Sequence, residues 1–327
     1  MTTITRNLSL ELVRVTEAAA LMAGRWMGRG DKEAADGAAV DALRQVLDTI
    51  DMQGVVVIGE GQKDKAPMLY TGEEVGTGQG PEVDIAVDPV EGTRLVAQGM
   101  PNSIVIMAVA ERGSLYGWQD IAYMEKIAVG PEAAGVIDID APVAVNLRRV
   151  ADAKGVDISD LTVVILDRPR HEQLIADVRE AGARMKLILD GDVAGGLMAA
   201  MPGTGIDLLM GIGGSPEAVI TACALKCVGG DMQTRLWPRN DEERRIVEEQ
   251  GLDTSKVWEI GDLVQSEDVF FVATGITDGE LLRGVHYFAD GATTHSLVMR
   301  ERSGTVRYVE SSHRLSKLRE MSNIPFD

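Results

Sequence analysis

Apolar residues near the start of the chain recur at the spacing of one face of a helix. This spacing covers residues 8–27 and again about 31–50, so it predicts two opening helices. Three runs rich in β-branched and other apolar residues follow, at 55–58, 83–87 and 103–110. Runs of this kind predict strands, and we expect the three to belong to one sheet.

The pattern changes near residue 161. Short apolar runs such as TVVIL and RMKLIL now alternate with helical stretches, which predicts a parallel sheet with crossover helices. Later runs, VFFVAT, HSLVMR and TVRYVE, predict further strands. A chain of 327 residues exceeds the usual size of a single core. We therefore predict two lobes, residues 1–155 and 156–327, that meet in the polar segment 141–160.

Composition narrows the classes of function. Apolar residues make up 45% and charged residues 25% of the chain, as in globular proteins. The sequence shows neither a membrane-length apolar run nor the apolar stretch of a signal peptide, so we expect a cytoplasmic protein. A formal net charge of −19 disfavours nucleic acid and anionic membranes as partners. A phosphorylated ligand would require locally concentrated cations.

Two residue types that often carry chemistry have plainer interpretations here. Cys223 and Cys227 are the only cysteines, and no His-rich or Cys-rich tract lies near them to complete a zinc site. We expect both to be small apolar fillers on one helix face in a reducing compartment. His171 is expected to start a helix rather than to act as a catalyst.

The strongest chemical signal is the segment DIAVDPVEGT. Pro89 is expected to end a strand, which would hold Asp88 and Glu91 on one tight turn. Two carboxylates so close repel each other unless a cation lies between them. Gly92 and Thr93 would then bring backbone and a hydroxyl close to a phosphate. The alternative is a solvated surface turn.

Two further acids stand where strands meet glycines. Glu60 follows a predicted strand in VVVIGEGQ, although an acid in such a turn often simply faces solvent. Glu217 lies in the first turn of a helix in GIGGSPEAVI, where helix-end electrostatics alone is an alternative explanation. Pro216 breaks the G-x-G-x-x-G pattern, so a dinucleotide site is excluded there.

The size of the barrier favours metal ions over acid–base catalysis alone. Hydrolysis of a phosphate monoester requires a barrier reduction approaching roughly 25–30 kcal/mol, whereas one general base contributes about 10²–10⁴-fold. Two or more cations can activate water and neutralise the phosphoryl oxygens. Ligands that are all carboxylates point to Mg²⁺ or Mn²⁺ rather than zinc.

Other residues suit the remainder of a substrate. Arg168 and Arg170 flank Pro169 at the end of a predicted strand, and two guanidinium groups there suit a phosphate. Pairing with surface acids is the alternative. The sequence DGD at 190–192 could bind sugar hydroxyls or cap the next helix, and both interpretations stay open. Tyr123 alone indicates only packing.

Taken together, these segments resemble the class II fructose-1,6-bisphosphatases, the GlpX-type family, which includes forms that also cleave sedoheptulose 1,7-bisphosphate. The resemblance rests on WMGRGDKEAADGAAV, VVIGEGQ, APMLYTGEEVG, VDIAVDPVEGT, YMEK, RPRH, DGD, MGIGGSPE and ATGIT, in that order. DPVEGT alone indicates only the wider lithium-sensitive sugar phosphatase superfamily.

The resemblance implies the layered α/β sandwich of sugar phosphatases, with the metal ligands mainly in the first lobe and the substrate residues mainly in the second. It implies that Asp36 and Glu60 bind one cation and that Asp88, Glu91 and Glu217 bind another. Thr93 would orient the attacking water. The implied substrate contacts are Glu91, Gly92, Thr93, Tyr123, Arg168, Pro169, Arg170, Asp190, Gly191, Asp192 and Gly214.

The chain departs from the family pattern at Gln62 and Lys65, where acids are common, and at Ser215, where alanine is usual. We expect a homo-oligomer that hydrolyses the 1-phosphate of fructose 1,6-bisphosphate in gluconeogenesis. Two alternatives stay open. One is a related phosphatase that acts on inositol phosphates or nucleotide bisphosphates, and the other is a non-catalytic regulator that binds sugar phosphates.

Overall fold

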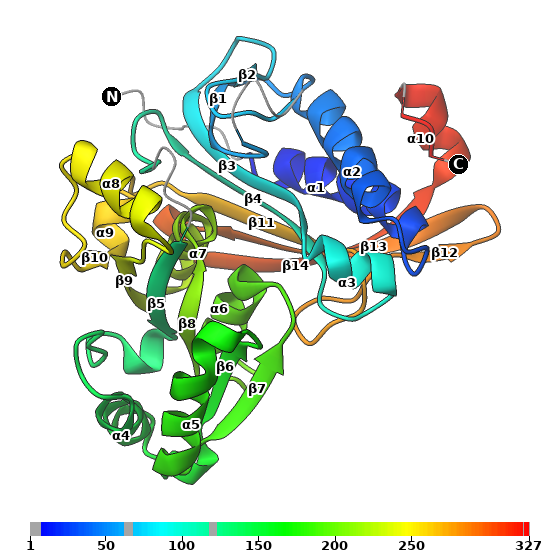
Figure 1. Cartoon of the computed structure of the whole chain (residues 1–327). Coiled ribbons are helices and arrows are strands. Elements are labelled where there is room, and N and C mark those ends of the chain that lie inside the picture. Colours follow the sequence, from blue (N-terminus) through cyan, green and yellow to red (C-terminus); the bar gives the residue numbers. More distant parts are fainter. Residues whose placement is uncertain (1–7, 62–67, 118–122, 323, 327) are drawn as a thin grey trace. The chain divides into compact units, whose positions relative to one another are not determined.

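The chain folds into two compact units in a computed structural model that describes residues 8–61, 68–117, 123–322 and 324–326 (Figure 1). The first unit combines Met1–Leu115 with Ser266–Asp327, and the second is Tyr116–Gln265. Each unit has its own sheet and its own hydrophobic core. The mixed α/β fold that the sequence predicts is confirmed.

The first unit contains an eight-stranded sheet, ordered β12-β13-β11-β4-β3-β1-β2, with β14 also paired to β13. β1 and β3 are parallel, while β4 pairs antiparallel with β3 and with β11. Its strands are β1 (Gln53–Ile58), β2 (Glu74–Val75), β3 (Glu82–Glu91), β4 (Ile104–Glu111), β11 (Phe270–Gly275), β12 (His286–Phe288), β13 (Gly291–Arg300) and β14 (Thr305–Arg314).

Two long helices pack on this sheet, as the apolar spacing predicts (Figure 1). α1 (Ser9–Ala23) lies against β11 and β13, and α2 (Lys32–Leu47) lies against α1 and β3. The side chain of Asp31 caps α2 by accepting the Ala34 N–H. Two shorter helices complete the unit, α3 (Thr93–Gln98) and α10 (Leu315–Met321).

The second unit contains a six-stranded sheet, ordered β10-β9-β5-β8-β6-β7. β6 is parallel to β7 and β8, as predicted, but β5 pairs antiparallel with both β8 and β9, so the sheet is mixed. Its strands are β5 (Tyr123–Val129), β6 (Thr162–Leu166), β7 (Arg184–Ile188), β8 (Leu208–Gly214), β9 (Asp231–Leu236) and β10 (Trp258–Glu259).

Helices cover both faces of the second sheet. Alternate strand residues, such as Val163 and Met210, share a core with α4 and α5, whereas Val164 and Leu209 face α6. α7 packs beside α6. The helices of this unit are α4 (Val143–Lys154), α5 (Glu172–Ala181), α6 (Asp192–Ala200), α7 (Ser215–Val228), α8 (Asp241–Glu249) and α9 (Ile260–Leu263).

The division between the units differs from the sequence-based boundary near residue 155. The second unit starts earlier, at Tyr116, because β5 pairs with β8 and β9. The chain returns to the first unit at Ser266, because β11 enters the first sheet between β4 and β13. The strands predicted near Phe270 therefore exist, but they belong with the N-terminal strands.

Two expectations about composition can be compared with the fold. Cys223 and Cys227 are unoxidised, buried and on α7, so they are the packing residues that the sequence predicts. Of the helices in the described ranges, none combines the length and the hydropathy needed to cross a membrane.

Candidate active site

The acids of DPVEGT lie on a β-bulge at the end of β3. Asp88 pairs with Ile106 of β4 and Glu91 pairs with Ile104, so β3 carries one extra residue between them. The prediction that Pro89 ends the strand was wrong, because the bulge accommodates a residue that cannot donate to the ladder. The Val90 N–H donates to Oδ1 of Asp88 at 3.0 Å. Glu91 is 4% exposed, which excludes the solvated surface turn for this acid.

The chain turns sharply after the bulge. Gly92 has a φ of +83°, in the left-handed region that favours glycine, and it precedes the first residue of α3, Thr93. The hydroxyl of Ser103 donates to the Glu91 carbonyl at 2.9 Å, which ties the bulge to the start of β4. Thr93 is therefore held beside the two acids by backbone geometry.

Glu60 follows β1 at the same edge of the sheet. β1 is parallel to β3, and Ile58 pairs with Ala86. Glu60 and Asp88 each come two residues after this pair, so they lie at the same height along the two neighbouring strands. The Glu60 N–H donates to the Leu69 carbonyl at 2.9 Å. Burial raises the pKa of Glu60 to about 7, with a further contribution from the neighbouring charge of Asp36.

Asp36 lies on α2, the helix that packs against β3. Its pKa is raised by burial and then by the negative charge of Glu33. The two acids that the resemblance assigns to one cation are therefore electrostatic neighbours in the fold. Burial is the larger cause of the raised pKa of Glu60, and repulsion between the two partly buried carboxylates adds to it.

The first unit thus gathers four of the five predicted metal ligands toward one edge of its sheet. In the part of the chain that the structure describes, however, no three His, Cys, Asp or Glu side chains form a ready-made metal site. Gln62 and Lys65, the departures from the family pattern, lie outside the described residues. The ligand assignments stay predictions.

Glu217 belongs to the second unit, in the first turn of α7. Its Oε2 atom is buried and has no hydrogen-bond partner among the described residues. Burial raises the pKa of Glu217, and nearby Asp192 raises it further, while Lys126 opposes both. A carboxylate that stabilised only a helix end would be solvated, so the orphaned oxygen argues for a ligand.

Two glycines of β8 make room for the acids of this unit. A Cβ atom on Gly214 would overlap the Glu217 carboxylate, and one on Gly213 would overlap Asp192. The φ of Gly214 is −64°, a value that any residue adopts, so the requirement for glycine there is steric. Glycine is needed because side chains, rather than an unusual backbone, occupy the space.

Asp192 is the first residue of α6, after Gly191, and its side chain accepts from Lys126 Nζ at 2.6 Å. Lys126 is only 3% exposed, so the pair is buried. Lys126 stands in the YMEK motif, yet sequence reasoning did not single it out. Its position on β5, opposite the strand that leads to Glu217, could not be read from local pattern.

The two arginines of RPRH have different partners. Arg168 forms an ion pair with Asp190, one of the acids predicted to bind substrate. Arg170 instead donates from Nε and from a terminal nitrogen to the Ile212 carbonyl, at 3.1 and 2.7 Å. No carboxylate of the described residues forms an ion pair with Arg170, so its charge is available to an anion.

His171, which immediately follows, is a structural residue, in agreement with the sequence interpretation. It is 1% exposed, its Nδ1 lies 2.7 Å from the Leu166 carbonyl, and its Nε2 accepts the Ile212 N–H at 2.7 Å. Tyr123, on β5, pairs with Gly214 of β8. Its ring lies under the guanidinium of Arg170, 5.1 Å from its centroid.

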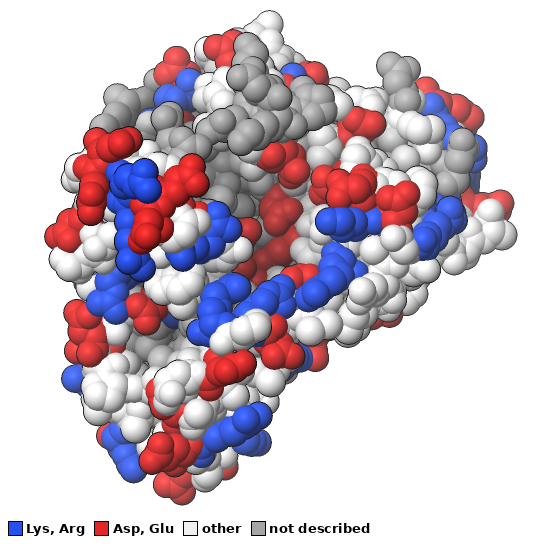
Figure 2. All heavy atoms as spheres, in the orientation of Figure 1, with Lys and Arg blue, Asp and Glu red and all other residues white. Residues whose placement is uncertain are grey.

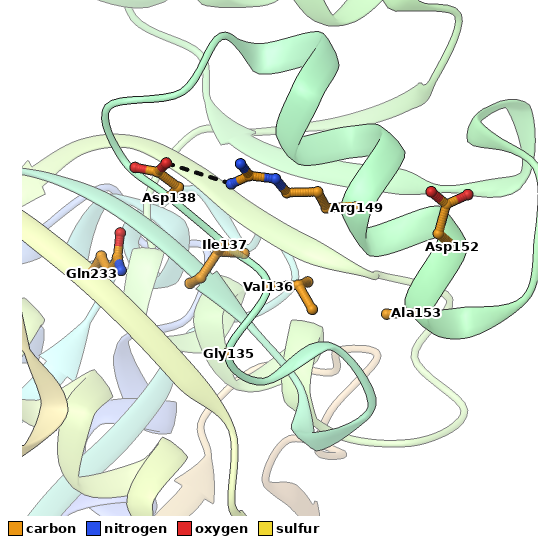
Figure 3. Close-up of a pocket in the computed structure, with 8 residues that line it drawn as sticks. All are labelled: Gly135, Val136, Ile137, Asp138, Arg149, Asp152, Ala153 and Gln233. Atoms are coloured by element: carbon orange, nitrogen blue, oxygen red, sulfur yellow. Dashed lines mark hydrogen bonds and ion pairs between the residues drawn. The ribbon is translucent and has the colours of Figure 1, made fainter.

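Charged side chains on the visible face form small mixed groups of acids and bases (Figure 2). An open hollow in the second unit, lined by residues 135–138, 149, 152–153 and 233, contains one such pair of an acid and a base. Figure 3 shows Asp138 and Arg149 pointing toward one another there, in an ion pair at 3.4 Å. Both side chains are nearly half exposed, and the hollow holds no buried acid or unpaired base among its lining residues. It is a poor candidate for the active site.

Comparison with known proteins identifies the family. Residues 6–313 match the profile described as "Bacterial fructose-1,6-bisphosphatase, glpX-encoded". The chain belongs to this family. It is 47% identical over 325 residues to "Fructose-1,6-bisphosphatase 1 class 2" of Escherichia coli K12, a match that covers 95% of this chain and 96% of that protein. Proteins named "Fructose-1,6-bisphosphatase class 2" in Escherichia coli O6:H1 and Shigella flexneri match equally well.

Fructose-1,6-bisphosphatases are phosphoric monoester hydrolases, so the family assignment confirms the class of enzyme that the motifs predict. The donor atoms of the predicted ligands also fit a hard divalent cation, because all are carboxylate oxygens. The buried, unpartnered oxygen of Glu217 is the structural observation that such a cation would explain. The region that matches the family, residues 6–313, covers nearly the whole chain and contains every predicted site residue.

Proposed function

We propose that this protein hydrolyses the 1-phosphate of fructose 1,6-bisphosphate, releasing fructose 6-phosphate and inorganic phosphate, with Mn²⁺ or Mg²⁺ as cofactor. One observation carries the proposal beyond family membership. The Oε2 atom of Glu217 is buried and has no hydrogen-bond partner among the described residues. An uncompensated buried carboxylate costs several kcal/mol, on the order expected for an ion taken out of water, unless a cation offsets it.

The acids would hold the cations in two sets, following the family resemblance. Asp36 and Glu60 would share one cation, and Asp88, Glu91 and Glu217 would hold another. When bound, divalent cations neutralise phosphoryl oxygens and lower the pKa of the attacking water. Thr93 is the first residue of α3, and its hydroxyl would orient that water toward phosphorus.

The second unit would bind the phosphate that is not cleaved. Arg170 has no carboxylate partner among the described residues, and its pKa is lowered by burial and by the neighbouring charge of Arg168. A phosphate dianion would relieve this repulsion by accepting from both guanidinium groups. Asp190 and Asp192 would accept hydrogen bonds from sugar hydroxyls, although each already pairs with a base.

The test is release of phosphate from fructose 1,6-bisphosphate with Mn²⁺ or Mg²⁺, with the sugar product identified enzymatically as fructose 6-phosphate. Asp88→Ala and Thr93→Ala should each lower kcat by at least about 100-fold. Asp152→Ala, which removes an exposed acid of the second unit, is the matched control and should have no effect. Unchanged turnover in Asp88→Ala would contradict the assignment.

A panel of substrates separates the alternatives. Sedoheptulose 1,7-bisphosphate, an inositol phosphate and a nucleotide bisphosphate should be assayed beside fructose 1,6-bisphosphate, with each metal in turn. Preference for the nucleotide or the inositol phosphate would favour the related phosphatases. Tight binding of fructose 1,6-bisphosphate without any release of phosphate would indicate a regulator.

A further inference from the structure

A second guanidinium group lies against the ring of Tyr123. Arg239 places its guanidinium carbon 4.8 Å from the ring centroid, compared with 5.1 Å for Arg170. Trp237 meets the same ring edge-on at 6.5 Å. The Tyr123 ring therefore contacts two guanidinium groups that are far apart in the sequence of the second unit. Neither the sequence motifs nor the proposed function uses Arg239.

The strand pairing fixes this arrangement. β5 and β9 pair from Met124 opposite Leu236, and the Trp237 N–H continues the ladder by donating to the Tyr123 carbonyl at 3.0 Å. Arg239 follows two residues later, just before the N-cap of α8, Asn240. Its position beside Tyr123 is thus set by a sheet and by a helix start.

A buried acid holds the Arg239 side chain in place. Glu243, which is 6% exposed, accepts from Arg239 Nε at 2.6 Å and from the Arg239 backbone N–H at 2.7 Å. The Glu243 N–H in turn donates to the Asn240 side chain at 2.9 Å. The Arg239 side chain nevertheless stays 47% exposed. An anchored guanidinium that still reaches solvent is preorganised for an anionic ligand.

The charges of this cluster are incompletely balanced. Arg168 pairs with Asp190 and Arg239 pairs with Glu243, whereas the hydrogen bonds that Arg170 donates within the described part of the chain go to the Ile212 carbonyl. Of these three guanidinium groups, that of Arg170 alone lacks an ion-pair partner among the described residues, although the charge of Asp192 lies near it. Because like charges gathered on one aromatic ring repel each other, an anion between them would be stabilising.

We propose that Arg239 is a further phosphate-binding residue, which acts with Arg170 beside Tyr123 to grip the phosphate that is not cleaved and so selects sugar bisphosphates. This inference rests on the proposed function and extends it. Arg239 provides planar, charge-assisted donors that suit a phosphate dianion. It determines specificity rather than chemistry, because it touches the end of the substrate that does not react.

The test compares Arg239→Gln with a matched control. Arg235→Gln removes a guanidinium from β9, the strand that precedes Arg239, but Arg235 is already satisfied by Glu125 and Asp140. For Arg239→Gln we expect KM for fructose 1,6-bisphosphate to rise by on the order of 10- to 100-fold, with kcat changed much less. The ratio of kcat/KM for fructose 1,6-bisphosphate to that for p-nitrophenyl phosphate, which lacks a second phosphate, should fall about tenfold or more. Arg235→Gln should leave KM and this ratio unchanged.

A binding measurement makes the result independent of turnover. Fructose 6-phosphate carries only the phosphate that is not cleaved, so its affinity for the metal-free protein can be measured by calorimetry. Arg239→Gln should weaken this affinity about tenfold or more, and Arg239→Lys, which keeps the charge without the planar fork, should lie between the wild type and Arg239→Gln. Circular dichroism melting confirms that each variant is folded.

The outcomes distinguish this inference from the proposed function. If the wild type hydrolyses fructose 1,6-bisphosphate but Arg239→Gln matches it in KM and in fructose 6-phosphate affinity, only the role of Arg239 is overturned. If the wild type neither hydrolyses the bisphosphate nor binds fructose 6-phosphate, both are overturned. A wild type that binds fructose 6-phosphate through Arg239 without hydrolysing the bisphosphate supports this inference and overturns the proposed activity.

Discussion

Ile212 donates its backbone N–H to Nε2 of His171 at 2.7 Å and accepts, at its carbonyl, two N–H groups from Arg170. Adjacent residues of RPRH thus hold both polar groups of one residue of β8. The bond to Leu166 requires Nδ1 to carry the proton and Nε2 to accept, so His171 must be neutral. Protonation of the ring would remove the acceptor of the Ile212 N–H.

Stability should therefore depend on pH through His171. Burial lowers the pKa of His171 below 6.5, and Arg170 and Arg168 lower it further, while Leu166 opposes them. As pH falls, the unfolded chain takes up the proton first, so this contribution is complete above about pH 6.5 and is lost as pH falls through the lower folded pKa. Urea unfolding at pH 8 and pH 5 should show a larger loss in the wild type than in His171→Gln.

The His171→Gln variant also measures the bond itself. Leaving a buried donor or acceptor unsatisfied costs about 1–3 kcal/mol, so the variant should be less stable by that amount at pH 8. Parallel stability curves from pH 8 to pH 5 for the two proteins would contradict the role of this histidine.

Gly214→Ala should damage activity through Glu217. The added Cβ would overlap the Glu217 carboxylate, so that side chain must move. We expect a loss of about 1–3 kcal/mol in the free energy of unfolding and a decrease of about 100-fold in kcat/KM. Gly261→Ala is the control, because a Cβ atom added at this helical position would meet open space. This variant should keep the stability and the kcat/KM of the wild type. Normal activity in Gly214→Ala would show that the position of Glu217 is unimportant.

Glu217→Gln should uncouple stability from metal. The amide keeps the shape but removes a buried carboxylate whose pKa burial raises, so the metal-free variant should be at least as stable as the wild type. Adding Mn²⁺ should raise the Tm of the wild type and have much less effect on the variant. Glu172→Gln, in the first turn of α5, controls for helix-end electrostatics and should keep the full response to Mn²⁺.

Asp268→Asn tests a buried ion pair of the first unit. Arg300 donates to both oxygens of Asp268 at 2.7 Å, and Asp268 is 3% exposed. Removing one partner of such a pair costs about 3–5 kcal/mol, so chemical unfolding should show that loss. The KM for fructose 1,6-bisphosphate should not change in the folded variant. A loss below about 1 kcal/mol would mean that the pair is solvated in solution.

Sequence reasoning predicted the elements better than their assembly. The opening helices and β1, β3 and β4 follow from local spacing and from caps such as Asp31, which act over a few residues. The continuation of β3 through Pro89 depends on the register with β4, which is a property of two strands. The return of β11 to the first sheet depends on long-range pairing in the same way.

In the candidate site too, some residues are recognisable from local sequence and others only from long-range packing. Asp88, Glu91 and Glu217 stand out locally, because proline and glycine mark the turns around them. Asp36 was reached only through the resemblance, since its proximity to Glu60 arises from packing of α2. Arg239 has a local signal, the Asn240-to-Glu243 cap that follows it, but its position beside Tyr123 depends on pairing of β5 with β9.

The late entry of β11 between β4 and β13 has a consequence for biosynthesis. The second unit is continuous in sequence, so a ribosome can release all of its strands while the first sheet still lacks its C-terminal half. Until residues 270–300 emerge, β4 is an unpaired edge rich in valine and isoleucine, the kind of surface on which nascent chains associate. Premature termination near Gln265 would therefore leave an aggregation-prone fragment rather than a smaller enzyme.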